Sequence, residues 1–432
     1  MESPARPEVG NESYLSKTNG INGKLREVPE DFVVNEIIEK GHRAHWAWAQ
    51  PSDNGRHSIV KITAKNWDTH VLIKEISKRL NIGQRAVGFA GTKDKRALTT
   101  QYISIMSSPN KIDKLDLENV SIEFIHKSVK PVRLGNLVAN EFKIKISQSK
   151  NEEKTIANIL DELKEGFPNY FGIQRFGAVR PITHTVGKKI VQDKYEEAVW
   201  DYLCGGKYES FGSEARQNLK NTKDLDMALQ EYPYKLLFER QIIGHLTRKK
   251  EDYIGAIRQL PENLSKMLVH AYQSLIFNHV LNLRIERGYS LHKPLIGDNI
   301  VPVDIYGGPD QRRIIEVTER NQKKLEKRCS EGKAWIVGLL PGIKSKHTNG
   351  IQGDLERQIM RDENIEFKDF SIGKIPELSS FGMYRPLNQK INDLKWKIDD
   401  DGKPTLEFWL HKGTYATSFL RELMKSENMR AY

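Results

Sequence analysis

The order of hydrophobic patterns along the chain restricts its possible folds more than any other feature. The runs DFVVNEII at 31–38 and EFKIKIS at 141–147 are typical of strands, and alternating residues flank the turn DDDGKP within 394–410. Between about 168 and 386 helical spacing dominates, and residues 265–288 are apolar on more than one face, which predicts a buried helix. Strands at both ends with helices between them predict an α+β domain interrupted by a mainly helical insertion.

Cysteine content and apolar runs exclude several classes of protein. The 432 residues include two cysteines, Cys204 and Cys329, so a disulfide framework and a CxxC zinc site are excluded. No run of 18 apolar residues occurs, and we therefore expect no membrane span. The first residues, MESPARPEVGNES, predict no signal peptide, and residues 1–22 predict a flexible N-terminus. We expect an intracellular, cytoplasmic protein, or a nuclear one if the source is eukaryotic.

The charge balance favours a polyanionic partner. Lys and Arg number 68 against 57 Asp and Glu, which gives a formal net charge of +11. Such an excess suits phosphate contacts, although a solvated Lys-rich surface explains it equally well. The helix-like run 311–328 holds seven Arg or Lys against three Glu. It is either an RNA-facing surface or a solvated face, and we favour the solvated face slightly.

Searches for common cofactor motifs give nothing. No GxxxxGK[ST], GxGxxG, HExxH or GxSxG motif occurs. The histidines include close pairs such as His42 and His45, but no Cys or carboxylate stands at ligand spacing, which favours solvated side chains. We therefore expect no metal, and ATP chemistry lacks its usual motif.

The segment GFAGTKDKRALTTQYISI at 88–105 carries the most unusual local chemistry. Asp94 stands among three cations, Lys93, Lys95 and Arg96, after a run of small residues. Such cations keep a carboxylate ionised, as a nucleophile requires. An Asx-turn or a surface ion pair is the more common role of such an Asp, and the local pattern leaves both interpretations open.

Two further segments combine turns with functional side chains. PNYFGIQRFG at 168–177 sets aromatic residues beside an arginine, which suits RNA stacking, but a tightly packed domain junction is the preferred interpretation. KGTYATSFLREL at 412–423 is a turn that leads into a helix. Neither segment alone indicates a function.

Together these segments resemble the TruD family of pseudouridine synthases. Seven motifs occur in family order between about Glu27 and Leu423: FVVNE (32–36), AGTKDKRALTTQ (90–101), LVANEFKI (137–144), PNYFGIQRFG (168–177), HAYQSLIFN (270–278), GLLPG (338–342) and KGTYATSFLREL (412–423). The middle region is similar in length to archaeal or eukaryotic members. Ala139 departs from the family pattern, which has Gly before the Asn of GNxF, and suggests a differently shaped turn there.

The resemblance implies an isomerase that converts uridine to pseudouridine, most typically at position 13 in the D-arm of tRNA. It implies structured RNA as partner and no cofactor; we also expect a monomer that does not bind a membrane. It also implies a pseudouridine-synthase-like catalytic domain with a mixed or antiparallel sheet, formed by residues 23–170 and 386–432 around a TruD insertion at 171–385. A non-catalytic tRNA-folding factor and a synthase of other RNAs remain alternatives.

The resemblance also assigns candidate site residues. Asp94 is the nucleophile, which attacks either the ribose C1′ or the uracil C6. A flipped uracil needs an apolar wall and polar partners for its edge. The supporting candidates are Glu36 as a base or orienting group, Lys93 as a partner of Asp94 or phosphate, Asn140 as a hydrogen-bonding group, Phe142 as a stacking ring and Tyr415 as a second wall. The in-phase neighbours of Phe142 fit a core residue too, although the resemblance favours the pocket.

Overall fold

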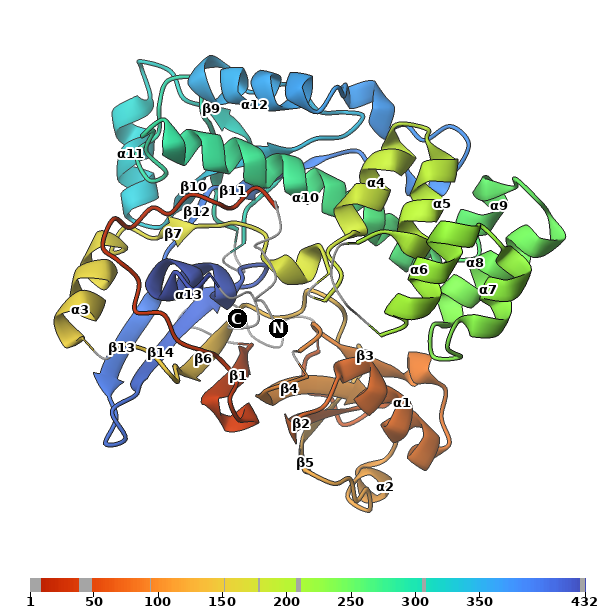
Figure 1. The fold of residues 1–432 in the computed structure, drawn as a ribbon. Coiled ribbons are helices and arrows are strands. Elements are labelled where there is room, and N and C mark those ends of the chain that lie inside the picture. Colours follow the sequence, from red (N-terminus) through yellow and green to blue (C-terminus); the bar gives the residue numbers. More distant parts are fainter. Residues whose placement is uncertain are drawn as a thin grey trace. The chain divides into compact units, whose positions relative to one another are not determined.

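The protein contains two compact units (Figure 1). The structure is a computed structural model, and it describes residues 9–38, 49–93, 95–150, 152–177, 179–206, 211–304, 308–427 and 432. The helical unit comprises Met1–Tyr14, Pro168–Pro302 and Gln311–Asn388. The sheet unit comprises Leu15–Phe167, Val303–Asp310 and Gln389–Tyr432. Each unit is therefore assembled from segments that are distant in sequence.

An eight-stranded mixed sheet organises the described part of the sheet unit. Its strand order is β13-β14-β6-β1-β4-β2-β5, with β3 beside β4. Strands β1 and β4 run parallel, whereas β6 pairs antiparallel with both β1 and β14. The strands are β1 (Phe32–Ile37), β2 (His57–Lys65), β3 (Val87–Phe89), β4 (Leu98–Ile105), β5 (Val120–Ser128), β6 (Ala139–Lys145), β13 (Asn392–Ile398) and β14 (Pro404–His411). The α+β prediction with a mixed sheet is confirmed.

Helices pack on hydrophobic clusters of this sheet. Helix α1 (Thr69–Leu80) begins at Asp68, whose side chain accepts hydrogen bonds from two backbone N–H groups, and it buries Leu72 and Ile76 against β2 and β4. Helix α13 (Ala416–Met424) and α3 (Glu153–Glu162) pack on the cluster formed by β1, β6 and β14. Full burial of each large apolar side chain, such as Phe419, contributes about 1.5–3 kcal/mol. The shorter elements are α2 (Pro109–Ile112), η1 (Pro29–Asp31) and η2 (Gln84–Ala86).

The N-terminal segment corrects one expectation. The sequence predicts a flexible region at 1–22, but the structure ties residues 15–22 to the end of α13. Ile21 N–H donates to the Leu423 carbonyl over 3.1 Å, and the Ser16 backbone and hydroxyl both donate to Glu422. Ile21 is fully buried. A polar composition did not reveal these contacts, because their acceptors lie about 400 residues away in the chain.

The helical unit surrounds one long buried helix, α10 (Glu262–Glu286), which packs against α4 and α12 (Figure 1). The other helices are α4 (Thr183–Val191), α5 (Tyr195–Cys204), α6 (Ser213–Thr222), α7 (Leu225–Glu231), α8 (Leu237–Arg248), α9 (Tyr253–Ile257), α11 (Gln322–Ser330), α12 (Gly350–Asp362), η3 (Ile173–Arg175), η4 (Phe367–Phe370) and η5 (Pro376–Leu378). Within the described ranges, no helix is long and apolar enough to cross a membrane.

The helical unit also contains a sheet that the sequence analysis missed. Four strands pair in the order β11-β10-β8-β9, with bounds Met383–Pro386, Ala334–Leu340, Asn299–Pro302 and Ile315–Glu316. The short strands β7 (Phe167–Pro168) and β12 (Asn388–Gln389) pair with each other. Within the basic run 311–328, helix begins only at Gln322, because β9 occupies part of its first half. The prediction of a helix over this whole run is therefore wrong.

His184 in α4 makes the stability of the helical unit dependent on pH. Its ring lies edge-on to Phe176, and no described residue hydrogen-bonds its buried Nδ1 atom. Burial, together with the nearby His279, lowers the pKa of His184 from 6.5 to about 4. The unfolded chain therefore binds a proton at higher pH than the folded chain, and stability falls as the pH drops through this window.

We expect wild type to lose about 3 kcal/mol more unfolding free energy than His184→Gln between pH 7 and pH 4. Urea unfolding of both proteins at each pH measures the difference. Other acidic groups titrate equally in both proteins and cancel. Equal losses in the two proteins would contradict the assignment of this pH dependence to His184.

Candidate active site

In the sheet unit, the strand register places two polar side chains, Glu36 and Asn140, next to each other at the end of the aromatic core. In the antiparallel ladders, Asn140 of β6 is opposite Glu36 of β1 on one side and Leu410 of β14 on the other. Directly opposed residues point to the same face of a sheet. Glu36 and Asn140 are more than 100 residues apart in sequence, yet they are neighbours on the face that carries the core.

Lys93 forms a buried ion pair with Glu36. Lys93 Nζ lies 2.6 Å from Glu36 Oε1, and the Tyr102 backbone N–H donates to the other carboxylate oxygen over 2.9 Å. The Lys93 backbone N–H donates to the hydroxyl of Thr69, the first residue of α1. Burial raises the pKa of Glu36, and the Lys93 ammonium opposes this shift. Both oxygens of Glu36 are occupied, so its geometry suits holding Lys93 in place rather than accepting a proton.

Asp94 follows Lys93 in the chain and lies outside the described residues. The preceding residue is fixed from two directions, by α1 through its backbone and by β1 through its ammonium group. These two anchors hold Lys93, the residue that precedes Asp94 in the chain. The prediction that Asp94 is a nucleophile is untested by this geometry.

Asn140 presents an unused hydrogen-bond acceptor. Its Oδ1 atom is buried, and no residue in the described part of the chain donates to it. A buried acceptor without a partner costs about 1–3 kcal/mol, so such atoms are rare and require an explanation. A donor from a bound ligand would remove that cost.

Gln101 was not identified as a candidate from the sequence. It is 1% exposed, and its Oε1 atom also lacks a hydrogen-bond partner among the described residues. Asn35 of β1 pairs with Thr100 of β4 in the parallel ladder. The next residue of each strand, Glu36 and Gln101, are therefore neighbours as well. Gln101 ends the AGTKDKRALTTQ segment, and its polar side chain in a strand of buried residues was the available signal.

Phe142 lies within the aromatic core. Its ring stacks on Phe408 at 5.4 Å between centroids and meets Phe32 edge-on at 6.3 Å. The residue is 7% exposed. This packing agrees with the core interpretation, since one ring face is already covered. Stacking of the uracil on Phe142 remains a prediction, and it requires the other face of the Phe142 ring.

The turn before α13 supplies hydroxyl groups next to Tyr415. The Lys412 backbone N–H donates to the Val138 carbonyl, so this turn is beside the start of β6. Tyr415 is half-buried and immediately precedes α13. The buried hydroxyl oxygens of Thr414 and Thr417 have no hydrogen-bond partner within the described ranges. Like Asn140 Oδ1 and Gln101 Oε1, these oxygens are buried acceptors that no described residue satisfies.

The described residues contain no group of three or more His, Cys, Asp or Glu side chains that could hold a metal ion. Among the candidate residues, the described carboxylate belongs to Glu36, and Lys93 and Tyr102 engage it. The described part of the site therefore combines one neutralised ion pair with buried neutral acceptors. Such a lining suits an uncharged ligand with hydrogen-bond donors on its edge.

Comparison with known proteins identifies the family. The sequence model described as tRNA pseudouridine synthase D (TruD) matches residues 8–423. The chain belongs to the TruD family. Its match includes every segment discussed above, from β1 to the turn that begins α13.

TruD relatives match over nearly the whole length. A protein of Methanococcoides burtonii named "Probable tRNA pseudouridine synthase D" is 38% identical over 98% of each chain. A protein of the same name from Thermococcus sibiricus is 38% identical over 95% of this chain and 97% of its own. The crystal structure of the putative TruD of Methanosarcina mazei superposes with a TM-score of 0.83 at 36% identity, with both chains fully covered.

The Ala139 departure from the TruD motif does not create a different turn. Ala139 lies within β6, paired with Ile37 on one side and His411 on the other, and it is fully buried. Its backbone does not adopt a positive φ, so the position does not require glycine. The expectation of a reshaped turn at this position is wrong, because the position is in a regular strand.

Proposed function

We propose that this protein is a tRNA pseudouridine synthase that converts uridine 13 of the D-arm to pseudouridine, with Asp94 as nucleophile. The observation that carries this proposal is the buried Lys93–Glu36 ion pair beside Asn140. It fixes the residue before Asp94 next to a face lined with unused acceptors. The family match and the names of its relatives support the reaction.

The reaction conserves its atoms. The bond between uracil N1 and ribose C1′ breaks, the uracil turns, and C5 bonds to C1′; the C5 proton leaves and N1 gains a proton. Asp94 forms a temporary covalent bond to the sugar or the base, and a carboxylate serves both as nucleophile and as leaving group. The step involves no net oxidation or reduction. ATP is not consumed.

Asn140 and Lys93 take separate roles in this proposal. The Asn140 Oδ1 acceptor receives the N3–H of the flipped uracil, which satisfies both groups in the water-poor site. Lys93 is neutralised by Glu36 and acts as a positioning residue rather than as the main acid. Phosphate contacts to the basic surface bind the tRNA, consistent with the net charge of +11.

Unmodified tRNA transcripts test the proposed function directly. The protein is incubated with Mg²⁺-annealed tRNA without ATP, and pseudouridine is mapped at nucleotide resolution. The expected product is one new pseudouridine at position 13, which a transcript with cytidine at that position lacks. Modification elsewhere would refute the assigned position, and salt-sensitive binding without any product would favour a tRNA-folding factor.

A further inference from the structure

Two turns of the helical unit form a rigid pair beyond the ends of β10 and β11. Leu340 of β10 pairs with Met383 of β11, and the turns at 341–346 and 379–382 continue from there. A Cβ atom added at Gly342 would lie 2.1 Å from the backbone nitrogen of Gly382, whose φ is +81°. Only glycine permits this approach, so the two turns are packed backbone to backbone.

Hydrogen bonds fix both turns to each other and to α10. Ile343 N–H donates to the Ser380 carbonyl over 2.9 Å. Gln273 of α10 is buried, and its amide nitrogen donates to the Pro341 carbonyl and the Ser380 hydroxyl. Gln273 belongs to the HAYQSLIFN segment and Pro341 to GLLPG. The two family motifs thus meet in one rigid structure outside the candidate active site.

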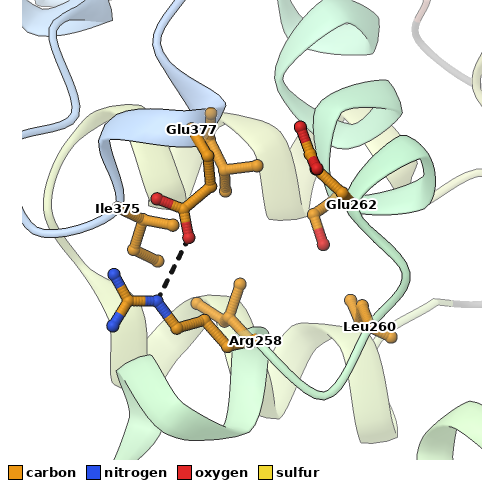
Figure 2. A pocket seen from close by; sticks show the side chains of 8 residues that line it. Arg258, Leu260, Glu262, Ile375 and Glu377 are labelled. Carbon is orange, nitrogen blue, oxygen red and sulfur yellow. Dashed lines mark hydrogen bonds and ion pairs between the residues drawn. The ribbon is translucent and has the colours of Figure 1, made fainter.

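A pocket of about 200 Å³ lies beside η5, which precedes the second turn (Figure 2). Arg258 lies across it and binds Glu377 over 3.2 Å and the Lys374 carbonyl over 3.1 Å. Figure 2 shows this ion pair, with Glu262 on the facing helix. The Arg258–Glu377 ion pair connects the end of α9 to η5, which leads into the second turn.

This rigid support presents an exposed aromatic ring with cations beside it. Phe381 is 61% exposed at the tip of its turn, and Met383 is 54% exposed. Lys344 Nζ lies 4.9 Å from the centroid of the Phe381 ring, and Lys346 is exposed two residues further along. No carboxylate in the described part of the chain forms an ion pair with Lys344 or Lys346. The ring is therefore exposed, and no carboxylate among the described residues neutralises the two cations.

We propose that Phe381, Lys344 and Lys346 form a platform that stacks one unpaired base of the RNA substrate and binds the adjacent phosphate. The proposal rests on the proposed function for its substrate. Single-stranded RNA is typically recognised by stacking on aromatic rings with Lys or Arg at the backbone. RNA fits better than a protein partner here, because Lys344 lies over the exposed ring, Lys346 is exposed two residues further along, and the chain has a net charge of +11.

Phe381→Ala is expected to weaken tRNA binding by about 10-fold, the size of one lost base stack. Phe381→Trp is expected to restore binding, since it restores a stacking surface. Phe211→Ala is the matched control, because Phe211 is 59% exposed on the same unit. The measurement is fluorescence anisotropy of labelled tRNA with the full chain, with thermal melting as a check of folding.

The salt dependence of tRNA binding distinguishes the contribution of the Phe381 ring from that of the lysines. Lys344→Ala is expected to reduce the slope of log Kd against log salt by about one ion, whereas Phe381→Ala leaves the slope unchanged. The binding assay does not depend on product formation, so it tests the platform even if the protein forms no pseudouridine. If Phe381→Ala binds tRNA as tightly as Phe211→Ala does, the platform is refuted, and a protein partner for Phe381, Lys344 and Lys346 is favoured instead.

Discussion

Asp94→Asn is expected to lower pseudouridine formation by at least about 10⁴-fold while the protein keeps its fold and its tRNA affinity. An amide has nearly the shape of the carboxylate but is neither anionic nor a useful nucleophile. No alternative carboxylate is expected to replace it, since Glu36 is engaged by Lys93 and by the Tyr102 N–H. Single-turnover mapping of pseudouridine on a tRNA transcript measures the rate.

Asp113→Asn is the matched control for this experiment. Asp113 is exposed at the end of α2, and the same chemical change there is expected to leave the rate unaltered. Thermal melting and tRNA binding of both variants establish that they are folded. Activity of Asp94→Asn close to that of Asp113→Asn would overturn the assignment of the nucleophile.

Lys93→Met is expected to reduce the unfolding free energy of the sheet unit by about 3–5 kcal/mol, because it leaves the Glu36 carboxylate buried without its cation. The same change should sharply reduce catalysis, since the residue before Asp94 loses one of its two anchors. Urea unfolding and the single-turnover rate are the two measurements. Lys95→Met alters an exposed lysine two residues further on and serves as the control for the unfolding measurement.

The stability deficit of Lys93→Met should depend on pH. Removal of the ammonium raises the folded-state pKa of Glu36 further above its ordinary value of 4.5. The folded variant then holds a proton that the unfolded chain releases, so the deficit is smallest near pH 4.5 and grows as the pH rises. The double variant Glu36→Gln with Lys93→Met should recover much of the stability. A deficit no larger than that of Lys95→Met would show that the ion pair has no structural role.

Local periodicity was sufficient to predict much of the fold. The C-terminal hairpin β13–β14 and the long helix α10 occur where alternating and helical patterns placed them. These elements bury one face or nearly all faces, so the arrangement of apolar residues reflects their environment directly. The four-stranded sheet was missed because its strands, such as AWIVGLL in β10, are short continuous apolar runs that fit helix or strand equally well.

The candidate site was only partly predictable, because strand register decides which residues meet. Lys93 and Asn140 were identified through the family motifs, but the position of Asn140 opposite Glu36 depends on the β1–β6 ladder. Gln101 was missed for the same reason, since its neighbour in space comes from β1. The packing of Phe142 between Phe32 and Phe408 depends on three strands at once.

The position of β14 in the sheet has a consequence for biosynthesis. β14 lies between β13 and β6, so the strand that carries Asn140 lacks one of its two neighbours until residues 404–411 have been synthesised. The segments of the helical unit end at Asn388 and are complete before then. Pairings over such separations form slowly and expose strand edges meanwhile. A nascent chain therefore carries an open β6 edge while residues 146–403 are synthesised, which makes this edge a natural point for chaperone protection and for aggregation of chains that stop before β14.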